Sequence, residues 1–211
     1  SSKNSWYVAY DNGKFQSGAF GCWKRDINEK FCSIERTHLS VEQKRQYAIQ
    51  LSEQKRIAEL EKVKQQDYVQ KQVNYRFNCA TTRGINTHQY LQSKGVKPHG
   101  LRIENSLLLT PMFNTDGEIA SLQTVSPTGS KLFAKGGRVK GCFLPIGTPE
   151  DTLILCEGYA TGASVYEATG EPVAVCFNSG NLLEVAKELS AKYPSARIII
   201  AGDDDHKLDK N

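Results

Sequence analysis

The sequence has no run of about 18 or more apolar residues, which argues against a membrane-spanning helix. No hydrophobic stretch follows residues 1–5, so there is no secretory signal, and the N-terminus could be a cut inside a longer chain. Internal repeats and low-complexity tracts are also missing. We therefore expect a cytoplasmic globular protein, with one ordinary domain or two small ones in its 211 residues.

The cysteines lack the spacing of a disulfide framework, although there are six of them: Cys22, Cys32, Cys79, Cys142, Cys156 and Cys176. Two of them fall within apolar segments that we expect to be buried strands. Free thiols in a reducing cytosol explain this pattern best. A zinc site formed by Cys22, Cys32 and His38, with Cys79 as a further ligand, is the alternative. No Cys-x-x-Cys pair supports it.

The overall charge is mild. The formal net charge is +4, and hydrophobic residues make up 39% of the chain, which is enough for a packed core. Such a charge permits binding to a polyanion without requiring it, so the local distribution of charge must decide.

Residues 1–38 are expected to form a small β-rich unit. The segment 6–10 is followed by a hairpin turn signal at residues 11–13. The aromatic residues of this unit stand beside basic ones, and both could contact unpaired bases and phosphates; they are Phe15, Phe20, Trp23, Lys14, Lys24 and Arg25. The interpretation we favour is that the aromatic side chains fill a small sheet core.

Residues 39–78 are expected to form a long polar linker helix. Ser40 and Gln43 have the spacing of a capping box, and neither glycine nor proline occurs from there to Phe77. An unbroken helix of this length would span roughly 55 Å. A helix that is polar on nearly all sides usually bridges domains, so its charges indicate a solvated face rather than a nucleic-acid-binding arm.

Residues 79–150 are expected to form a small α+β subdomain. Thr87 is a candidate N-cap of a short helix that ends at Gly95. Three strands then follow, at 106–111, 118–125 and 131–133, with turns between them at Asp116-Gly117 and Pro127-Thr128-Gly129. This order predicts an antiparallel meander.

From residue 151 onward, strands alternate with helices. We expect strands at 152–156, 172–176 and 197–201 and helices at 160–169 and 182–192, an order typical of a parallel sheet. Glu157 follows the first strand, and Asp203, Asp204 and Asp205 follow the last. Parallel sheets carry their sites at the carboxyl ends of the strands, so these carboxylates should converge. Mg²⁺ prefers such oxygen ligands.

Together, Glu157-Gly158, the turn Asn178-Ser179-Gly180-Asn181 and Asp203-Asp204-Asp205 resemble the TOPRIM domain of topoisomerases, bacterial primases and some nucleases. Upstream, Asp116-Gly117 followed by Gln123, and then Lys131-Leu132-Phe133, resemble the basic subdomain that precedes TOPRIM in bacterial primases. The segments 157–162 and 167–170 are similar to the signature of plasmid- and phage-borne primases of the TraC-like, primase-helicase group. The resemblance implies an α/β TOPRIM domain at 151–211, incomplete at its C-terminus.

The resemblance also implies roles for individual residues. Asp203 and Asp205 would hold one or two Mg²⁺ or Mn²⁺ ions, and Glu157 would be a further ligand or a general acid/base. Four basic residues would contact nucleic acid or nucleotide, namely Lys131, Lys135, Arg138 and Lys140. Asp204 would face away from the metal or act indirectly. A histidine next to a Mg²⁺ site, such as His206, is more often a bystander than a ligand. The turn 178–181 is either the phosphate-binding start of a helix or a plain N-cap.

The function implied is primer synthesis on a single-stranded DNA template from nucleoside triphosphates. The partners would be a helicase or other replication domains, and no membrane. Two alternatives stay open: a TOPRIM nuclease that cleaves DNA with the same metal site, and a non-catalytic DNA-binding or replication-accessory module.

Overall fold

The computed structural model describes residues 4–11, 16–22, 24–33 and 40–202. The chain divides into two compact units, Ser1–Leu60 and Glu61–Asn211. The helix α1 (Val41–Cys79) begins in the first unit and ends in the second. No helix in the described part of the chain has an apolar stretch long enough to cross a membrane.

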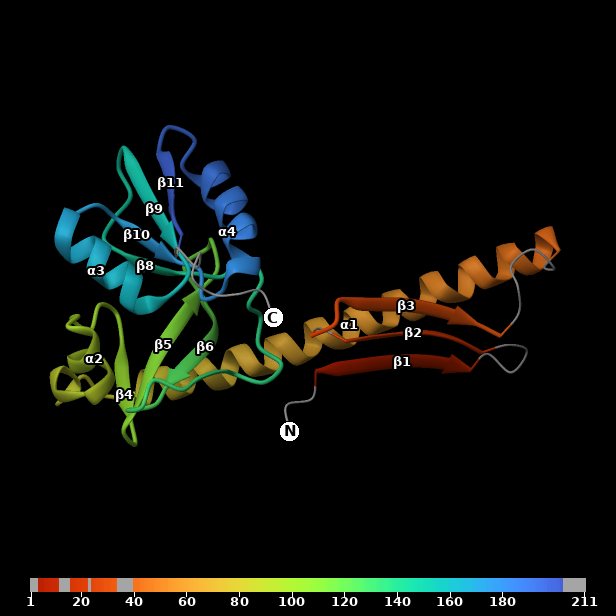
Figure 1. The fold of residues 1–211 in the computed structure, drawn as a ribbon, viewed down its shortest axis with the longest axis horizontal. Helices are drawn as coiled ribbons and strands as arrows, with labels where there is room; N and C mark the ends of the chain where they lie inside the picture. The colour runs from red at the N-terminus through yellow and green to blue at the C-terminus, as the bar shows by residue number, and fades with distance from the viewer. Residues whose placement is uncertain (1–3, 12–15, 23, 34–39, 203–211) are drawn as a thin grey trace. The chain divides into compact units, whose positions relative to one another are not determined.

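The first unit contains a three-stranded antiparallel sheet, drawn in red and orange in Figure 1. Its strands β1 (Ser5–Asp11), β2 (Gln16–Cys22) and β3 (Ile27–Cys32) pair in chain order. Most of the predicted hairpin turn lies outside the described residues, as do Lys14, Phe15 and Trp23. Phe20 is 45% exposed and Tyr7 is 83% exposed, so these two rings do not form the packed aromatic core that we expected.

The second unit begins with an antiparallel sheet that the C-terminal part of α1 covers. Its strands β4 (Arg102–Glu104), β5 (Leu107–Phe113), β6 (Ile119–Val125) and β7 (Lys131–Phe133) pair in chain order. Val69, Val73 and Phe77 recur at every fourth residue of α1, so they share one helix face. They are buried against Leu109, Ile119 and Leu122 of the sheet.

A short helical segment, η2 (Ile85–Thr87) and α2 (Gln89–Lys94), precedes β4. Our prediction that Thr87 caps this helix was wrong. Its hydroxyl donates to the carbonyl of Gly84 instead, at 2.7 Å. The N-cap is His88, whose Nδ1 accepts the backbone N–H of Tyr90. Gly95 ends α2 in the left-handed conformation, as predicted.

The last part of the chain forms an α/β layer structure around a four-stranded sheet. The strands lie in the order β11 (Arg197–Ala201), β9 (Thr152–Cys156), β10 (Val173–Val175) and β8 (Leu144–Ile146). The first three are parallel, as predicted, while β8 runs antiparallel to β10 and was not anticipated.

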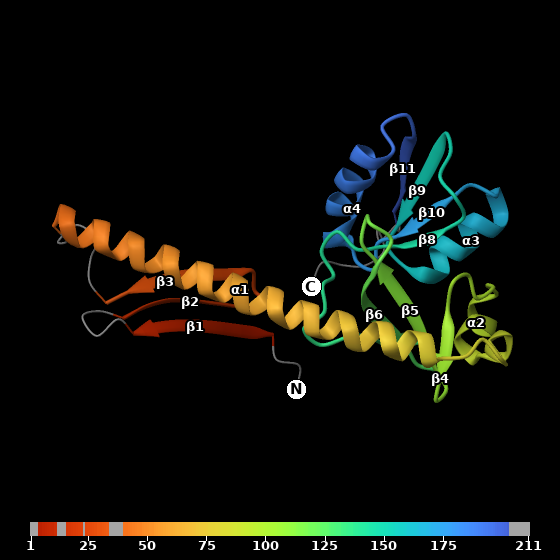
Figure 2. The ribbon, with the colours of Figure 1, turned by 180° about the vertical axis from the view of Figure 1, so that it is seen from behind.

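Two helices cover the opposite faces of this sheet, as Figures 1 and 2 show. The helix α3 (Tyr159–Thr169) packs Ala163 in the cluster that contains Ile154 and Cys156. The helix α4 (Ser179–Lys192) packs Val185 and Leu189 in the cluster that contains Leu153 and Leu155. Because neighbouring residues of a strand point to opposite faces, the two helices must lie on different sides. The helix α4 starts three residues earlier than predicted.

A pair of backbone hydrogen bonds joins the two sheets of the second unit. The N–H of Phe113, at the end of β5, donates to the carbonyl of Phe143 at 2.7 Å. The N–H of Phe143 donates back at 2.9 Å. Phe143 directly precedes β8, so β5 lies beside the antiparallel edge of the α/β sheet. The antiparallel sheet is thereby held against the α/β layer.

Candidate active site at the carboxyl edge of the parallel sheet

The carboxyl ends of β9 and β11 lie side by side. Ala201 pairs with Cys156 in the parallel register, so Gly202 and Glu157 are the next residues on neighbouring strands. Glu157 is half-buried. Asp203, Asp204, Asp205 and His206 lie outside the described residues. The described part of the chain therefore places Glu157 one strand away from the point where the aspartate cluster begins.

The turn after Glu157 leads directly into α3, and the glycines of the predicted signature explain how. Gly158 is the N-cap of α3 and provides no side chain to its first turn. A β-carbon on Gly162 would lie 2.8 Å from Cys156 Sγ and 2.7 Å from Val175 Cγ2. Only glycine at position 162 lets α3 approach β9 and β10 so closely, and this approach sets the position of the Glu157–Gly158 turn.

Lys131 reaches the same turn from the antiparallel sheet. Its Nζ lies 3.9 Å from the place where a β-carbon on Gly158 would stand. Lys131 Nζ also lies 6.0 Å from the centre of the Tyr90 ring. The negative face of that ring attracts the cation. A positive charge from β7 is thus held next to the residue that follows Glu157.

The end of the basic segment between β7 and β8 also lies at this edge, because the start of β8 pairs with the end of β10. Lys140 Nζ forms a 3.1 Å ion pair with Glu184 of α4. The hydrogen bond from Lys140 lowers the pKa of the Glu184 carboxyl. Arg138 Nε donates to the carbonyl of Lys140, and Lys135 is exposed. Lys131 approaches the Glu157–Gly158 turn, whereas Lys140 is engaged with α4.

Asn181 joins this basic segment to the parallel sheet, a role that no sequence pattern predicts. Its Oδ1 accepts the N–H of Gly141 at 2.8 Å. Its Nδ2 donates to the carbonyls of Cys142 and Cys176, at 2.8 and 2.9 Å. The side chain is 4% exposed and stands in the first turn of α4. One buried amide therefore joins the segment before β8, the end of β10 and the start of α4.

The residues at this edge fit a hard divalent cation by their chemistry. Carboxylate oxygens are the ligands that Mg²⁺ and Mn²⁺ prefer, and the predicted ligands Glu157, Asp203 and Asp205 are all carboxylates. Among the described residues, no group of three or more potential ligand side chains lies together. Two of the three predicted ligands fall outside that part of the chain. The metal site stays a prediction that the placement of Glu157 supports.

The cysteines give no sign of a second site. None of the six forms a disulfide, and Cys142, Cys156 and Cys176 are buried. Burial raises the pKa of the Cys176 thiol to about 12, so this thiol is protonated at neutral pH. Within the described residues, Cys22, Cys32 and Cys79 form no metal-binding cluster, and His38 lies outside them.

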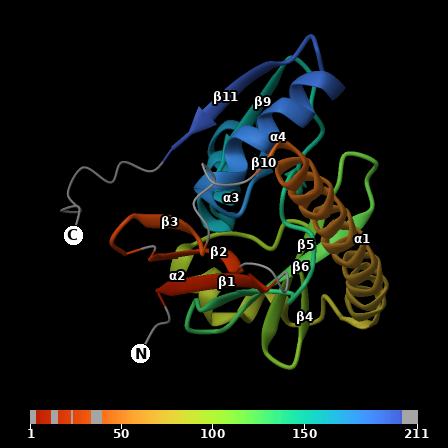
Figure 3. The same ribbon diagram turned by 90° about the vertical axis from the view of Figure 1, so that its right-hand side faces the viewer.

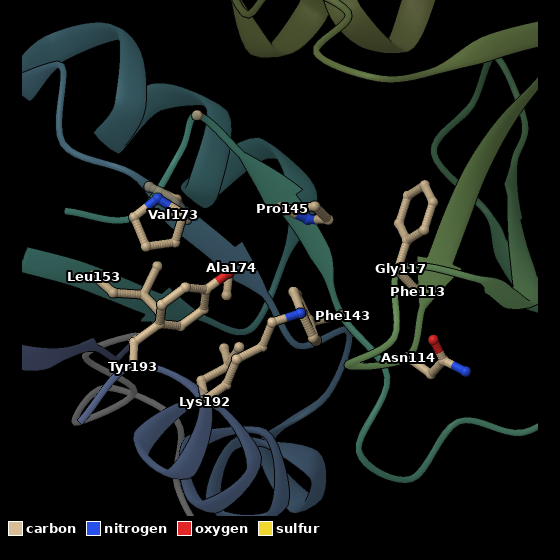
Figure 4. Close-up of a pocket in the computed structure, with 13 residues that line it drawn as sticks. Phe113, Asn114, Gly117, Phe143, Pro145, Leu153, Val173, Ala174, Lys192 and Tyr193 are labelled. Carbon is tan, nitrogen blue, oxygen red and sulfur yellow. The ribbon is translucent and has the colours of Figure 1, made fainter. Parts of the chain in front are cut away.

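A separate apolar pocket of about 270 Å³ lies at the other end of the parallel strands (Figure 4). Leu153 near the start of β9 and Val173 at the start of β10 line it, together with Phe113 and Phe143. Lys192 closes one side by donating to the carbonyl of Thr115. Glu157 follows the opposite end of β9 from Leu153 and does not line this pocket.

The comparisons with known proteins agree with this architecture. The family model described as "Toprim domain" matches residues 152–209. The chain is 41% identical over 127 residues to a DNA primase TraC of Escherichia coli, covering 56% of this chain and 9% of that protein. A second DNA primase TraC of Escherichia coli is 38% identical over 127 residues, covering 56% of this chain and 12% of its own length.

The chain spans about a tenth of the length of the curated relatives it matches. The Toprim match begins at the first residue of β9 and includes Glu157, Asp203 and Asp205. The chain therefore carries a Toprim domain and is similar to TraC-like DNA primases, which confirms the resemblance that its motifs indicated.

Proposed function

We propose that this chain is part of the catalytic core of a mobile-element DNA primase, which synthesises short primers on single-stranded DNA by metal-dependent nucleotidyl transfer. One observation carries the proposal. The parallel pairing of β9 with β11 brings Glu157 and the segment leading to Asp203 to one edge, and Lys131 approaches that edge from β7. The similarity to TraC primases supports the same reaction class.

In the proposed site, Glu157, Asp203 and Asp205 hold Mg²⁺ or Mn²⁺, with Glu157 as a ligand or as a general acid/base. When bound, the metal would supply charge neutralisation for an in-line nucleotidyl transfer, in which a 3′-hydroxyl attacks the α-phosphorus of a nucleoside triphosphate and pyrophosphate leaves. The protein's own part is positioning, so no covalent nucleophile is needed. Asp204 acts only indirectly.

The basic residues are proposed to bind the template and the triphosphate, because both are anionic. Lys131 is proposed to contact a phosphate at the Glu157–Gly158 turn, and two observations support this: its Nζ approaches Gly158, and the first amides of α3 receive no side-chain cap. Lys135, Arg138 and Lys140 extend the positive charge along the segment before β8. Lys140 would have to exchange Glu184 for a phosphate, which makes it the weakest candidate of the four.

The partners we propose are single-stranded DNA, nucleoside triphosphates and a helicase or other replication domains, in the cytoplasm. The TraC primases are far longer than the matched stretch, so such domains have room outside it in those relatives.

The proposal is tested by changing both aspartates, Asp203→Asn and Asp205→Asn, in the full-length protein that contains this chain. Template-dependent nucleotide incorporation with Mg²⁺ or Mn²⁺ should fall at least about a hundredfold, because the metal would lose two ligands. Asp204→Asn is the matched control and should keep most of the activity. Circular dichroism should show that all variants are folded.

Three outcomes would contradict the proposal, and two of them favour an alternative. Normal primer extension by the double variant would refute the assignment of the metal site. Nicking of plasmid DNA with Mn²⁺ and no nucleotides, lost in the same variant, would favour a TOPRIM nuclease. Binding to single strands that is salt-dependent, but indifferent to divalent ions and to Glu157→Gln, would indicate a non-catalytic module.

A further inference from the structure

We infer that Phe133, supported by Phe177, stacks on an unpaired nucleobase beside the acidic edge. The inference rests on the proposed function and deepens it, because it names the part of the substrate that the antiparallel sheet recognises. The base could belong to a single DNA strand or to a nucleoside triphosphate, and the shared chemistry is a flat π-face next to a phosphate.

The alternation of β7 places the aromatic ring and the cation together. Side chains two residues apart on a strand point to the same face, so Lys131 and Phe133 share one side and Leu132 takes the other. Lys131 faces Gly158 after β9, and Phe133 meets Phe177 after β10. Both therefore project toward the carboxyl ends of the parallel strands. Two residues of a strand span roughly 6.6 Å, a separation that one nucleotide bridges from phosphate to base.

The packing of Phe133 holds the ring while leaving part of it open. Its ring centre lies 6.4 Å from that of Phe177, with an angle of 72° between the planes, an edge-to-face arrangement. Phe177 is 8% exposed, whereas Phe133 is 39% exposed. A base can stack on the open part of Phe133, because every base presents a π-face to an aromatic side chain.

The backbone at Phe177 gives an independent reason to regard this pair as functional. Its φ is +71°, a left-handed conformation that is unusual for a bulky residue and that glycine would adopt more easily. Asn181 holds the preceding residue in place through the carbonyl of Cys176. Strained residues tend to cluster at sites of function, where the surrounding structure maintains them. Here the strain presents an aromatic ring to Phe133.

The test measures binding by the full chain, carrying the Asp203→Asn and Asp205→Asn changes and without divalent ions, so that catalysis plays no part. The probes are a labelled single-stranded oligonucleotide, the same strand with abasic positions, and a nucleoside triphosphate. In this background, Phe133→Leu should weaken binding of the normal strand or of the triphosphate by roughly 5- to 150-fold. It should leave abasic-strand binding unchanged. Phe133→Tyr should restore binding.

Leu132→Ala is the control, since Leu132 is 68% exposed on the other side of the same strand. It should leave all three affinities unchanged. If Phe133→Leu weakens binding of the strand alone, the stacked base belongs to the template or primer. If it weakens binding of the triphosphate alone, the stacked base belongs to the incoming nucleotide. Equal weakening for normal and abasic strands would show a structural role and overturn the inference. Unchanged binding in Phe133→Leu, or no binding of any probe by the parent chain, would overturn it too.

Because no step of this test depends on catalysis, its result is separate from that of the primer-synthesis assay. A chain that stacks bases through Phe133 but is insensitive to the aspartate changes would keep this inference and lose the proposed enzyme. A chain whose primer synthesis depends on Asp203 and Asp205, but whose binding does not depend on Phe133, would keep the proposed enzyme and lose this inference.

Discussion

Asn181 shows how one residue can decide the shape of the candidate site. Its amide satisfies the Gly141 N–H and the Cys142 and Cys176 carbonyls, all in a region with little access to water. Buried polar groups that lose their partners cost about 1–3 kcal/mol each. The basic segment before β8 is thus held by these buried hydrogen bonds in addition to the ion pair between Lys140 and Glu184.

We predict that Asn181→Ala lowers the free energy of unfolding by about 2–5 kcal/mol, because two buried carbonyls and one N–H lose their partner together. Urea titration followed by circular dichroism measures this change. Asn178→Ala is the control from the same turn, since the Asn178 side chain makes no capping hydrogen bond to α4. Its cost should stay within about 0.5 kcal/mol. Equal costs for the two variants would contradict this account of Asn181.

At the scale of elements, a second polar contact ties the loop after α2 to α3. Glu167 Oε1 accepts the backbone N–H of Lys97 at 2.8 Å and meets His99 Nε2 at 2.7 Å. The hydrogen bond from Lys97, and then the contact with His99, lower the pKa of the Glu167 carboxyl. Nearby, the Tyr159 hydroxyl donates to the carbonyl of Lys97 at 2.6 Å and accepts the N–H of His99.

This contact predicts a pH-dependent effect of Glu167→Gln. The pKa of Glu167 is lower in the folded chain than in the unfolded one. The stability that the Glu167 carboxylate contributes is therefore complete above its pKa in the unfolded chain, about 4.3. It is lost as the pH falls through its pKa in the folded chain. We expect Glu167→Gln to lower stability at pH 7 by less than about 1 kcal/mol, because the pair is near the surface.

Thermal unfolding at a series of pH values checks this expectation. The difference between the parent chain and Glu167→Gln should shrink as the pH falls below about 4 and the Glu167 carboxylate takes up a proton. Glu171→Gln, at an exposed position just after α3, should show little difference at any pH. A difference that grows toward low pH would have the wrong sign and would refute the role given to the carboxylate.

The elements also show what sequence patterns can predict here. β9, β11 and β7 have the bounds we expected, because each is a short run closed by glycine, charge or a turn signal. β8 and β4 were not anticipated: each has three residues, and Pro145 in the middle of β8 argues against a strand. Ser179 and Gly180 looked like a turn, yet they form the start of α4.

The candidate site likewise has one part that sequence patterns predict and another that they do not. The topology of a parallel sheet predicts that Glu157 and the aspartate cluster share an edge, and the pairing of β9 with β11 supports this. The approach of Lys131 to Gly158 and the contact of Phe133 with Phe177 depend on how two sheets pack. Local sequence does not encode such packing. The motifs therefore predict a site chemistry that stays a hypothesis, while the neighbours of each side chain could not be predicted from them.

At the scale of the whole chain, the hydrophobic core lies in the second unit. Among the described residues, every buried hydrophobic side chain falls between Val69 and Leu189. The last part of α1 belongs to that core, because Val69, Val73 and Phe77 cover Leu109, Ile119 and Leu122. The first unit, Ser1–Leu60, contributes a small sheet with exposed aromatic residues. Within the second unit, Figure 3 shows α4 beside the strands β9 and β11.

We therefore predict that a chain starting at Glu61 folds without the first unit. Its thermal unfolding midpoint should lie within about 4 °C of the parent's, a shift that corresponds to about 1 kcal/mol for a protein of this size. A chain starting at Ala80 is the matched comparison, because it also lacks Val69, Val73 and Phe77 and would expose the sheet residues they cover. It should aggregate or unfold without a cooperative transition, since burying each such side chain is worth about 1.5–3 kcal/mol. Loss of cooperative unfolding in the longer fragment would show that residues 1–60 are needed for the core to form, while cooperative unfolding of the shorter one would show that α1 is dispensable.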